Sequence, residues 1–300
     1  MMFLNATTKH TKRLFDFSCL SCLSWFHFRL KPEFCVELVA AGGPGPAWIH
    51  SGSGSRLPGG NLLNPRVKSL AQKLLPHFLV AWLDPFQEAI EAEARAAAGQ
   101  VRPGDVVLDA GAGEARHKRY FTCGSYLALD SAIGDPKWDY SRIDVLGDLE
   151  KIPLRSGTVR SVLCMVVLEH TRNPRRVLGE FARVLRSGGS LYLVVPFLWE
   201  EHQAPHDYLR FTRHGVRLLM QDLPLRINLL APIGGFFWLC ARRCINLLGF
   251  FQQSWRWLLF FPLAPLFGLI FPVLLYFLDG LDKKQDFSLG FRIRATKDGE

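Results

Sequence analysis

The pattern of apolar and polar residues divides the chain into three regions. Residues 1–61 show no sustained period, and their last part, from Gly42, is rich in Gly, Pro and Ser. Helical spacing begins at Asn64, and beyond about residue 100 short aliphatic runs alternate with helical stretches. This alternation predicts a parallel sheet with helices on both faces, the doubly wound α/β class. The predicted strands are Asp105–Asp109, Ser125–Asp130, Arg142–Val145, Val159–Val167 and Ser190–Pro196, with an amphipathic helix over Pro174–Leu185.

The third region, Leu229 to Leu278, is much more apolar than the rest, and residues 285–297 then predict a final strand. The stretch from Trp257 to Leu278 carries no charge; as an uninterrupted helix it would measure ~33 Å, enough to cross a bilayer core of ~30 Å. Three prolines, Pro262, Pro265 and Pro272, are expected to break that helix. If the final strand pairs with a strand over Leu225–Leu230, both ends of the insertion lie on one side of the membrane, which excludes a single crossing.

We therefore expect a pair of broken helices that dips into one leaflet; the alternative is an apolar lid or dimer interface packed against protein. The residues expected near lipid headgroups are Trp238, Arg242, Arg243, Trp255, Arg256 and Trp257. The expected organisation is an irregular leader and linker over 1–61, a main domain over 62–233, a membrane-associating insertion over 234–284 and the final strand of the main domain over 285–300.

Charge and cysteine content narrow the setting. The chain has 36 Lys+Arg against 27 Asp+Glu, a formal net charge of +9, so we expect an acidic partner: anionic lipid, nucleic acid or a phosphorylated substrate. The basic residues are scattered or flank apolar runs, which disfavours nucleic acid. Seven cysteines indicate a reducing compartment, because the number is odd and the chain is too long to need disulfides. The pair Cys19 and Cys22 lacks a second pair at zinc-finger spacing.

A glycine loop follows the first predicted strand. Asp109 and Ala110 precede Gly111 and Gly113, and the two glycines allow a tight turn that approaches a ligand. A dinucleotide fingerprint wants a further small residue where Arg116 stands, and no Gly-Lys-Ser/Thr follows. Pyrophosphate binding is therefore disfavoured, whereas the Asp109 carboxylate would attract an ammonium group.

Further carboxylates end the next two strands. Asp130, before Ser131, has two oxygens that suit the hydroxyls of a ribose, and Asp148, before Leu149, is placed to accept from an adenine amino group. All of these positions fall at the carboxyl edge of the sheet, where open α/β sheets bind ligands. The alternative is structural: Asp109 and Asp130 cap helices, and the glycines serve ordinary turns.

In this order, the segments resemble the class I S-adenosylmethionine-dependent methyltransferases, specifically the group that includes ubiquinone and menaquinone methyltransferases. The resemblance also rests on DLEKIPLR from Asp148, VRSVLCMVVLEH from Val159 and ARVLRSGGSLYLV from Ala182. It implies a mostly parallel seven-stranded Rossmann-like sheet with an apolar helical insertion before the last strand, and S-adenosyl-L-methionine as cofactor. The residues it implies for cofactor binding are Asp109, Ala110, Gly111, Gly113, Asp130, Ser131, Asp148, Leu149 and Cys164.

The loop after the last parallel strand is dense in His, carboxylate and aromatic groups. This segment, from Pro196 to Thr212, is similar to one in bacterial methyltransferases found with surface-polysaccharide genes. We expect it to cover the acceptor, with His206, His202 or His170 as base and Arg210 holding an anionic group. The alternative is that Asp207 pairs with Arg210, Thr212 caps a helix and His170 is structural. No metal is expected, because methyl transfer from a sulfonium needs none; a site from His202, His206 and Asp207 is the weaker option.

These observations predict a methyltransferase acting on a membrane-proximal small molecule, lipid or lipid-linked saccharide. We expect it at the cytoplasmic face of a membrane, as a peripheral or monotopic protein. We do not expect nucleic acid to be its partner. The alternative from another functional class is a non-catalytic membrane-bound module that retains the fold for binding.

Overall fold

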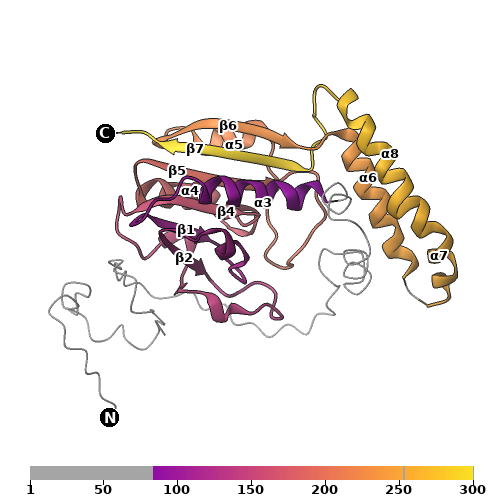
Figure 1. The fold of residues 1–300 in the computed structure, drawn as a ribbon, viewed down its shortest axis with the longest axis horizontal. Helices are drawn as coiled ribbons and strands as arrows, with labels where there is room; N and C mark the ends of the chain where they lie inside the picture. Colours follow the sequence, from indigo (N-terminus) through magenta and orange to yellow (C-terminus); the bar gives the residue numbers. More distant parts are fainter. Residues whose placement is uncertain (1–83, 253, 300) are drawn as a thin grey trace, which may run out of the picture.

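A seven-stranded mixed sheet organises the described residues, 84–252 and 254–299, of the computed structural model (Figure 1). The strand order is β3-β2-β1-β4-β5-β7-β6, and β7 runs antiparallel to the other six strands. The doubly wound α/β prediction is confirmed. The predicted leader over 1–61, its cysteine pair and the helical stretch from Asn64 lie outside the described residues. The strands are β1 Val106–Ala110, β2 Ser125–Asp130, β3 Val145–Leu146, β4 Val159–Met165, β5 Leu185–Pro196, β6 Leu225–Ile233 and β7 Gly290–Lys297.

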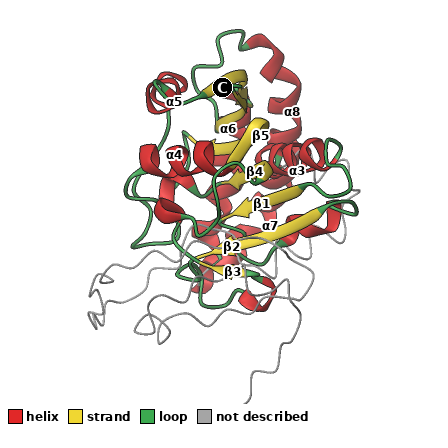
Figure 2. Ribbon diagram, turned by 90° about the vertical axis from the view of Figure 1, so that its left-hand side faces the viewer, coloured by secondary structure: helices red, strands yellow, loops and turns green. Residues whose placement is uncertain are grey.

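Helices cover both faces of the sheet (Figure 2). Helix α3 (Pro85–Ala98) packs on one face, where Phe86 and Ala94 meet the inward side chains of β4 and β5. Helix α4 (Pro174–Val184) packs on the other face with its fully buried Phe181, and α5 (Arg213–Met220) lies beside it. Because successive strand residues point to opposite faces, β4 sends Val162 to one cluster and Leu163 to the other.

The third strand differs from its prediction. Instead of a strand over Arg142–Val145, a 3₁₀ turn occupies Tyr140–Arg142 and the strand itself is Val145–Leu146. The side chain of Asp139 accepts from the Ser141 amide at 3.0 Å, which caps the turn and starts it where a strand was expected.

A helical hairpin stands between β6 and β7. It comprises α6 (Phe236–Leu247), α7 (Trp257–Pro265), a π-helical turn over Leu266–Ile270 and α8 (Phe271–Leu278). The predicted helix break at the prolines is wrong, because Trp257–Leu281 is one continuous helical run. Pro262 and Pro265 lie inside α7, and the backbone accommodates the missing donors as a π turn instead of ending the helix.

Carboxylates from the end of the hairpin fix its beginning. The amides of Gly235 and Trp238 donate to Asp279, and the Phe236 amide donates to Asp282 at 2.8 Å. These contacts satisfy the free amides of the first turn of α6, a position that favours negative charge. Both ends of the hairpin are thereby held at the sheet.

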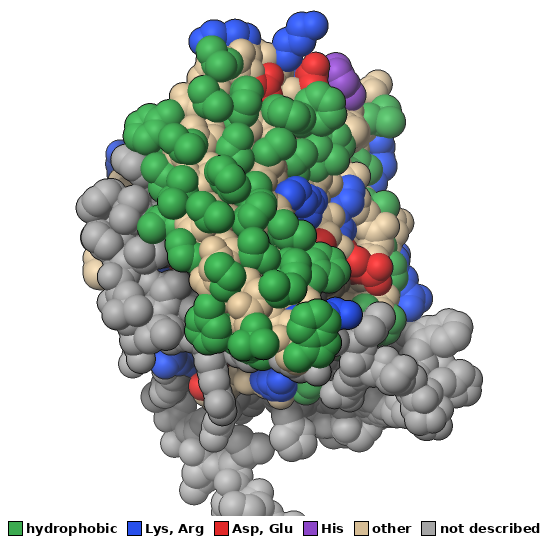
Figure 3. Space-filling view, turned by 90° about the vertical axis from the view of Figure 1, so that its right-hand side faces the viewer, with side chains coloured by type: hydrophobic (Ala, Val, Ile, Leu, Met, Phe, Trp, Pro, Cys, Tyr) green, Lys and Arg blue, Asp and Glu red, His purple; other side chains and the backbone are tan. Residues whose placement is uncertain are grey.

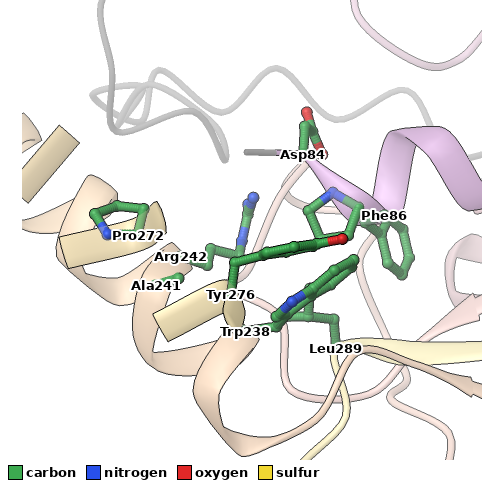
Figure 4. A pocket seen from close by; sticks show the side chains of 9 residues that line it. Asp84, Phe86, Trp238, Ala241, Arg242, Pro272, Tyr276 and Leu289 are labelled. Carbon is green, nitrogen blue, oxygen red and sulfur yellow. The ribbon is translucent and has the colours of Figure 1, made fainter. Parts of the chain in front are cut away.

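An aromatic junction connects the hairpin to the start of α3 (Figure 4). The rings of Trp238 and Tyr276 stack with centroids 5.5 Å apart, and a small pocket separates them from Phe86 and Leu289. Trp238 therefore contacts the protein through Tyr276, and its place near lipid headgroups stays a prediction.

The last strand is also tied to α3 by charge. The carboxylate of Glu93, which is fully buried, accepts from Arg294 of β7 at 2.6 and 3.1 Å. The predicted pairing of the final strand with the strand from Leu225 is confirmed by the register Leu230↔Ile293. Because β6 and β5 run parallel, β6 ends at the same edge as β1, β4 and β5, and the hairpin leaves the sheet from that carboxyl edge.

Candidate functional site

The glycine loop is pinned between the ends of two strands. Gly111 has φ +80° and Gly113 φ +53°, conformations that side chains rarely adopt. The Gly111 amide donates to Leu129 O at 2.8 Å. A Cβ on Gly111 would clash with both γ-methyl groups of Val167, lying 2.5 Å from Cγ2, and a Cβ on Gly113 would lie 3.2 Å from the Trp138 ring. The glycines are therefore required by the turn and by close packing.

The Asp130 carboxylate reaches this loop from the end of β2. Its Oδ2 accepts from the Gly113 amide at 2.9 Å and its Oδ1 from the Ala132 amide at 2.7 Å. A carboxylate has about four lone-pair sites, so two remain for hydroxyl donors. Asp130 is partly exposed, and Ser131 beside it is exposed. The structure thus brings Asp130 and Gly113 together at the expected edge.

Asp148 follows β3 and lies in the same row. It is exposed, and its Oδ1 accepts from the Glu150 amide at 2.8 Å, which caps the 3₁₀ turn Leu149–Lys151. Leu149 is buried in the core below. Asp148 therefore caps this turn through one oxygen while the residue stays exposed to solvent.

Asp109, which we expected to attract a ligand's ammonium group, is buried. Its side chain is 1% exposed and accepts a hydrogen bond from the Tyr126 hydroxyl, while His117 Nδ1 lies 3.4 Å away. Burial and the Asp109 carboxylate both raise the pKa of Tyr126. Burial acts to lower the pKa of His117, but Asp109 outweighs it and raises the value. Binding of an ammonium group by Asp109 stays a prediction; the residue nearer the surface is His117, which the sequence analysis missed.

The end of β4 supplies apolar groups other than the one expected. Cys164 is fully buried in the core with Ala110, and burial raises the pKa of its thiol. Val166, two residues further on, is half-buried and has φ +59° although it is β-branched. Such strained residues cluster at functional sites, and here the strain aims Val167 at the glycine loop.

A second cluster lies beyond β4, where the chain forms a 3₁₀ turn over Leu168–His170. Glu169 is fully buried, and its Oε1 lies 3.8 Å from His170 Nε2 and 3.7 Å from His202 Nε2. The loop after β5 delivers His202, and the Tyr208 amide of that loop donates to Glu169 O at 3.0 Å. Burial acts to lower the pKa of His202, but Glu169 and Asp207 outweigh it and raise the value. The sequence analysis named Glu169 only as the neighbour of His170.

Arg210 is an internal strut of the same loop. It donates to both oxygens of Asp207 at 2.6 Å and to Glu200 O at 2.8 Å. Burial acts to raise the pKa of Asp207, but hydrogen bonds from Arg210 and the His202 amide lower it below its usual range. The expectation that Arg210 holds an anionic acceptor is therefore wrong, because its guanidinium is already paired, as the alternative required.

The rest of the loop follows the same pattern. Thr212 caps α5 by accepting from the Gly215 amide at 2.9 Å. His206 turns to the Tyr208 hydroxyl at 2.9 Å and not to the Glu169 cluster. The set His202, His206 and Asp207, considered for a metal, is therefore not assembled, whereas His170 and His202 do meet.

The loop also contacts the hairpin. Arg242 pairs with Glu200 and stacks over the Trp199 ring at 3.4 Å, and Arg243 Nη1 lies 3.2 Å from Glu200 Oε2. Arg242 and Arg243, expected near headgroups, instead hold the segment that leads to His202.

The edge as a whole suits a cationic nucleoside. Carboxylates end β1, β2 and β3 in sequence, Asp130 keeps free lone pairs next to a glycine loop, and a phosphate would meet like charge there. These residues fit the adenosine and the cation of S-adenosylmethionine better than a dinucleotide.

Comparison with known proteins gives the following matches. Residues 108–193 match the family model described as a methyltransferase domain. An uncharacterised 37.1 kDa protein in a transposon of Streptomyces fradiae is 30% identical over 128 residues, which are 39% of this chain and 37% of that protein. The chain thus spans well under two thirds of this curated relative.

Solved structures with similar folds are more distant. The [4+2]-cyclase SpnF is 15% identical with a TM-score of 0.46, covering 70% of this chain and 82% of its own. The 1,6-didemethyltoxoflavin-N1-methyltransferase of Burkholderia thailandensis, with bound S-adenosylhomocysteine, is 16% identical with a TM-score of 0.43, covering 88% and 95%. Geranyl diphosphate methyltransferase, in complex with GPP and sinefungin, is 15% identical with a TM-score of 0.44, covering 70% and 78%.

Proposed function

We propose that this chain, which carries a methyltransferase domain within a Rossmann-like methyltransferase fold, is an S-adenosylmethionine-dependent methyltransferase that acts on a membrane-proximal acceptor. The acceptor class is a small amphiphile, a lipid or a lipid-linked saccharide. The observation that carries the proposal is the Asp130 carboxylate, held by the Gly113 and Ala132 amides at the carboxyl edge inside the matched segment.

The residues of the edge have distinct roles toward the cofactor. S-adenosylmethionine supplies a methyl group on a sulfonium that is its own leaving group, so the protein must mainly align and bind. Asp130 accepts from the ribose hydroxyls, and the exposed Asp148 accepts from the adenine amino group. The Gly111–Gly113 turn permits close approach of the backbone. Asp109, together with His117, sets the charge at the methionine end.

The acceptor side lies at the ends of β4 and β5. A hydroxyl acceptor needs a group that takes its proton, and His170 and His202 are the candidates at the Glu169 cluster. His206, paired with Tyr208, is the third candidate on the outer side of the loop. The loop is held in place by the Asp207–Arg210 pair, so acceptor groups would meet a fixed wall.

The hairpin supports a membrane partner. Only 11% of the best apolar window in Trp257–Leu281 is buried, and apolar side chains cover this face (Figure 3). Leu258, Phe261 and Phe277 are 66–74% exposed, and Trp255 is 67% exposed at the turn beside Arg256. A soluble monomer rarely exposes such a patch, and Trp with Arg suits the headgroup layer.

The geometry of the hairpin links the membrane to the site. Both of its ends are held at the carboxyl edge, by Asp279 and Asp282 and by the neighbouring strands. We place the protein as a monotopic protein at a cytoplasmic membrane face. In the described residues the cysteines Cys123, Cys164, Cys240 and Cys244 are free thiols, as a reducing compartment requires.

Cofactor binding is tested by calorimetry on the purified full chain in mild detergent. We expect S-adenosylmethionine to bind and Asp130→Asn to weaken it at least tenfold, because a carboxylate that accepts two ribose hydroxyls is lost. Asp135→Asn, in the same loop, is the matched control: within residues 84–252 and 254–299, its carboxylate accepts from the Lys137 amide alone. Absence of binding, or equal loss in both variants, would overturn the cofactor assignment.

Methyl transfer is tested by incubating the protein with radiolabelled S-adenosylmethionine and a fractionated extract. Label in the lipid or lipid-linked fraction is the expected result. Cofactor binding without label in any fraction would favour the non-catalytic module, and label in protein or nucleic acid would reject the acceptor class.

Membrane contact is tested by flotation with phosphatidylglycerol-containing vesicles. The double variant Leu258→Glu/Phe261→Glu should lose flotation, whereas Leu218→Glu, on α5 and 65% exposed, should keep it. If the double variant instead dissolves a dimer and the intact protein never floats, the patch binds a second copy and the lipid assignment fails.

A further inference from the structure

The buried cluster of Glu169, His170 and His202 has unused coordinating atoms. Both oxygens of Glu169, His170 Nε2 and His202 Nε2 lack hydrogen-bond partners among the described residues. One ligand atom from each residue lies within 4.8 Å of the others. A fully buried carboxylate without partners costs several kcal/mol, so this arrangement calls for a cation.

The outer nitrogens of the two imidazoles fix which atoms face the carboxylate. His170 Nδ1 lies 2.7 Å from His206 O, a carbonyl that can only accept, so Nδ1 carries the proton. His202 Nδ1 lies 3.2 Å from Glu200 O and 3.3 Å from Asp207 Oδ2, both acceptors and both closer than Arg210 Nη2 at 3.5 Å. In the neutral form, which metal binding requires, each imidazole therefore turns a lone pair on Nε2 toward Glu169.

This pattern is the one that metal-binding histidines show. Such histidines donate their outer N–H to a carboxylate or carbonyl, which fixes the tautomer and the ring orientation. Tetrahedral Zn²⁺ with ligands at ~2.0–2.2 Å holds their atoms roughly 3.3–3.6 Å apart. The Glu169–His distances of 3.7 and 3.8 Å are slightly longer, and the three ligand atoms lie within 4.8 Å of one another, so the side chains must draw together around an ion. Protonated imidazoles would instead hydrogen bond to the carboxylate at about 2.7–2.9 Å.

We propose that Glu169, His170 and His202 form a binding site for a divalent transition metal ion of the Zn²⁺ type. Two imidazoles and one carboxylate favour Zn²⁺, Fe²⁺ or Co²⁺ over Mg²⁺ and Ca²⁺, which prefer oxygen ligands. Three protein ligands leave one position of a tetrahedral ion open. This binding does not depend on methyl transfer. With the metal bound, His170 and His202 have no lone pair left to accept a proton, and His206 is then the candidate base.

The test is metal binding to the full chain after treatment with a chelator. Zn²⁺ affinity is measured by competition with a chromophoric chelator, and Co²⁺ is used as a spectroscopic probe. We expect one equivalent whose Co²⁺ spectrum shows nitrogen and oxygen ligation without a thiolate charge-transfer band, which separates it from binding by cysteines. Mg²⁺ at millimolar concentration should not compete.

The variants identify the ligands. Glu169→Gln and His202→Gln should each weaken Zn²⁺ binding at least a hundredfold. Asp207→Asn, which changes an outer partner of His202, should weaken it about 10–100-fold. His206→Ala is the matched control, since its side chain faces Tyr208 and its carbonyl, which anchors His170, is retained; it should bind as the unaltered protein does. Circular dichroism checks folding of each variant.

Three outcomes would overturn the proposal: no binding of Zn²⁺ or Co²⁺ to the unaltered chain, binding through thiolates only, or equal affinity in the His202→Gln and His206→Ala variants. If Glu169→Gln does not fold, His202→Gln and the Co²⁺ spectrum of the unaltered chain still decide the question.

Discussion

Replacing Gly111 by alanine should destabilise the protein more than the backbone conformation alone explains. At φ +80° an L-residue costs about 1–2 kcal/mol relative to glycine. The new Cβ would also clash with the γ-methyl groups of Val167, and such overpacking costs about 1–3 kcal/mol. Gly111→Ala should therefore lower the free energy of unfolding by about 2–5 kcal/mol, a large share of the ~5–15 kcal/mol of a typical domain.

Two further variants separate the contributions. Gly157 has φ +71° with nothing within 4 Å of an added Cβ, so Gly157→Ala should cost only the backbone share of about 1–2 kcal/mol. Adding Val167→Ala to Gly111→Ala removes the two closest contacts, with the γ-methyl groups, but leaves the φ strain and a Cβ–Cβ approach of 3.0 Å, and should recover part of the lost stability. The coupling energy between the two positions should be about 1–3 kcal/mol.

The assay is urea unfolding in mild detergent, followed by tryptophan fluorescence and circular dichroism. Coincident transitions from the two probes establish that a single free energy applies. Equal losses in Gly111→Ala and Gly157→Ala, or a double variant less stable than the sum of its single changes, would refute the view that Val167 closes down on the glycine loop.

Two more predictions concern charge. Glu93→Ala should lower the free energy of unfolding in urea by about 2–4 kcal/mol, less than the loss of a fully buried ion pair, because the Arg294 side chain is 36% exposed. Glu88→Ala, which removes the exposed Glu88–Arg95 pair, should cost below ~0.5 kcal/mol. Similar losses in the two variants would contradict this prediction. Asp109 raises the folded-state pKa of His117. The interaction between the two side chains therefore stabilises the fold fully below about pH 6.5, and this stabilisation is lost as the pH rises through the folded-state pKa of His117. His117→Gln should therefore flatten the decline in unfolding free energy above that pH, and an unchanged slope would exclude this coupling.

The sequence predicts the long, buried strands, because their apolar runs are distinct from the polar residues that flank them. The bounds of β2 are those expected, because its apolar run ends in a charged residue at the sheet edge. β3 was misplaced since two residues carry little periodic signal and the cap formed by Asp139 favours a turn. The prolines of the hairpin were expected to break a helix, but a π turn absorbs the lost donors.

The sequence could predict which residues lie at the site, but not which of their side chains contact one another. The sequence indicates that Asp130 and the glycines share an edge, because parallel strands end together. It offers the Asp207–Arg210 pair only as an alternative to anion binding, and it does not indicate that His202 contacts Glu169, since these contacts depend on how the loop after β5 folds back over the end of β4. A polar loop with several short-range partners offers many pairings, and only tertiary packing selects one.

The position of β7 sets an order of events during synthesis. β5 and β6 do not pair with each other, because β7 lies between them in the sheet. The ribosome makes β7 only after the whole apolar hairpin. Until that strand emerges, β5 has an open edge and β6 lacks a partner in the sheet. The hairpin therefore leaves the exit tunnel before the strand that completes its scaffold has been made.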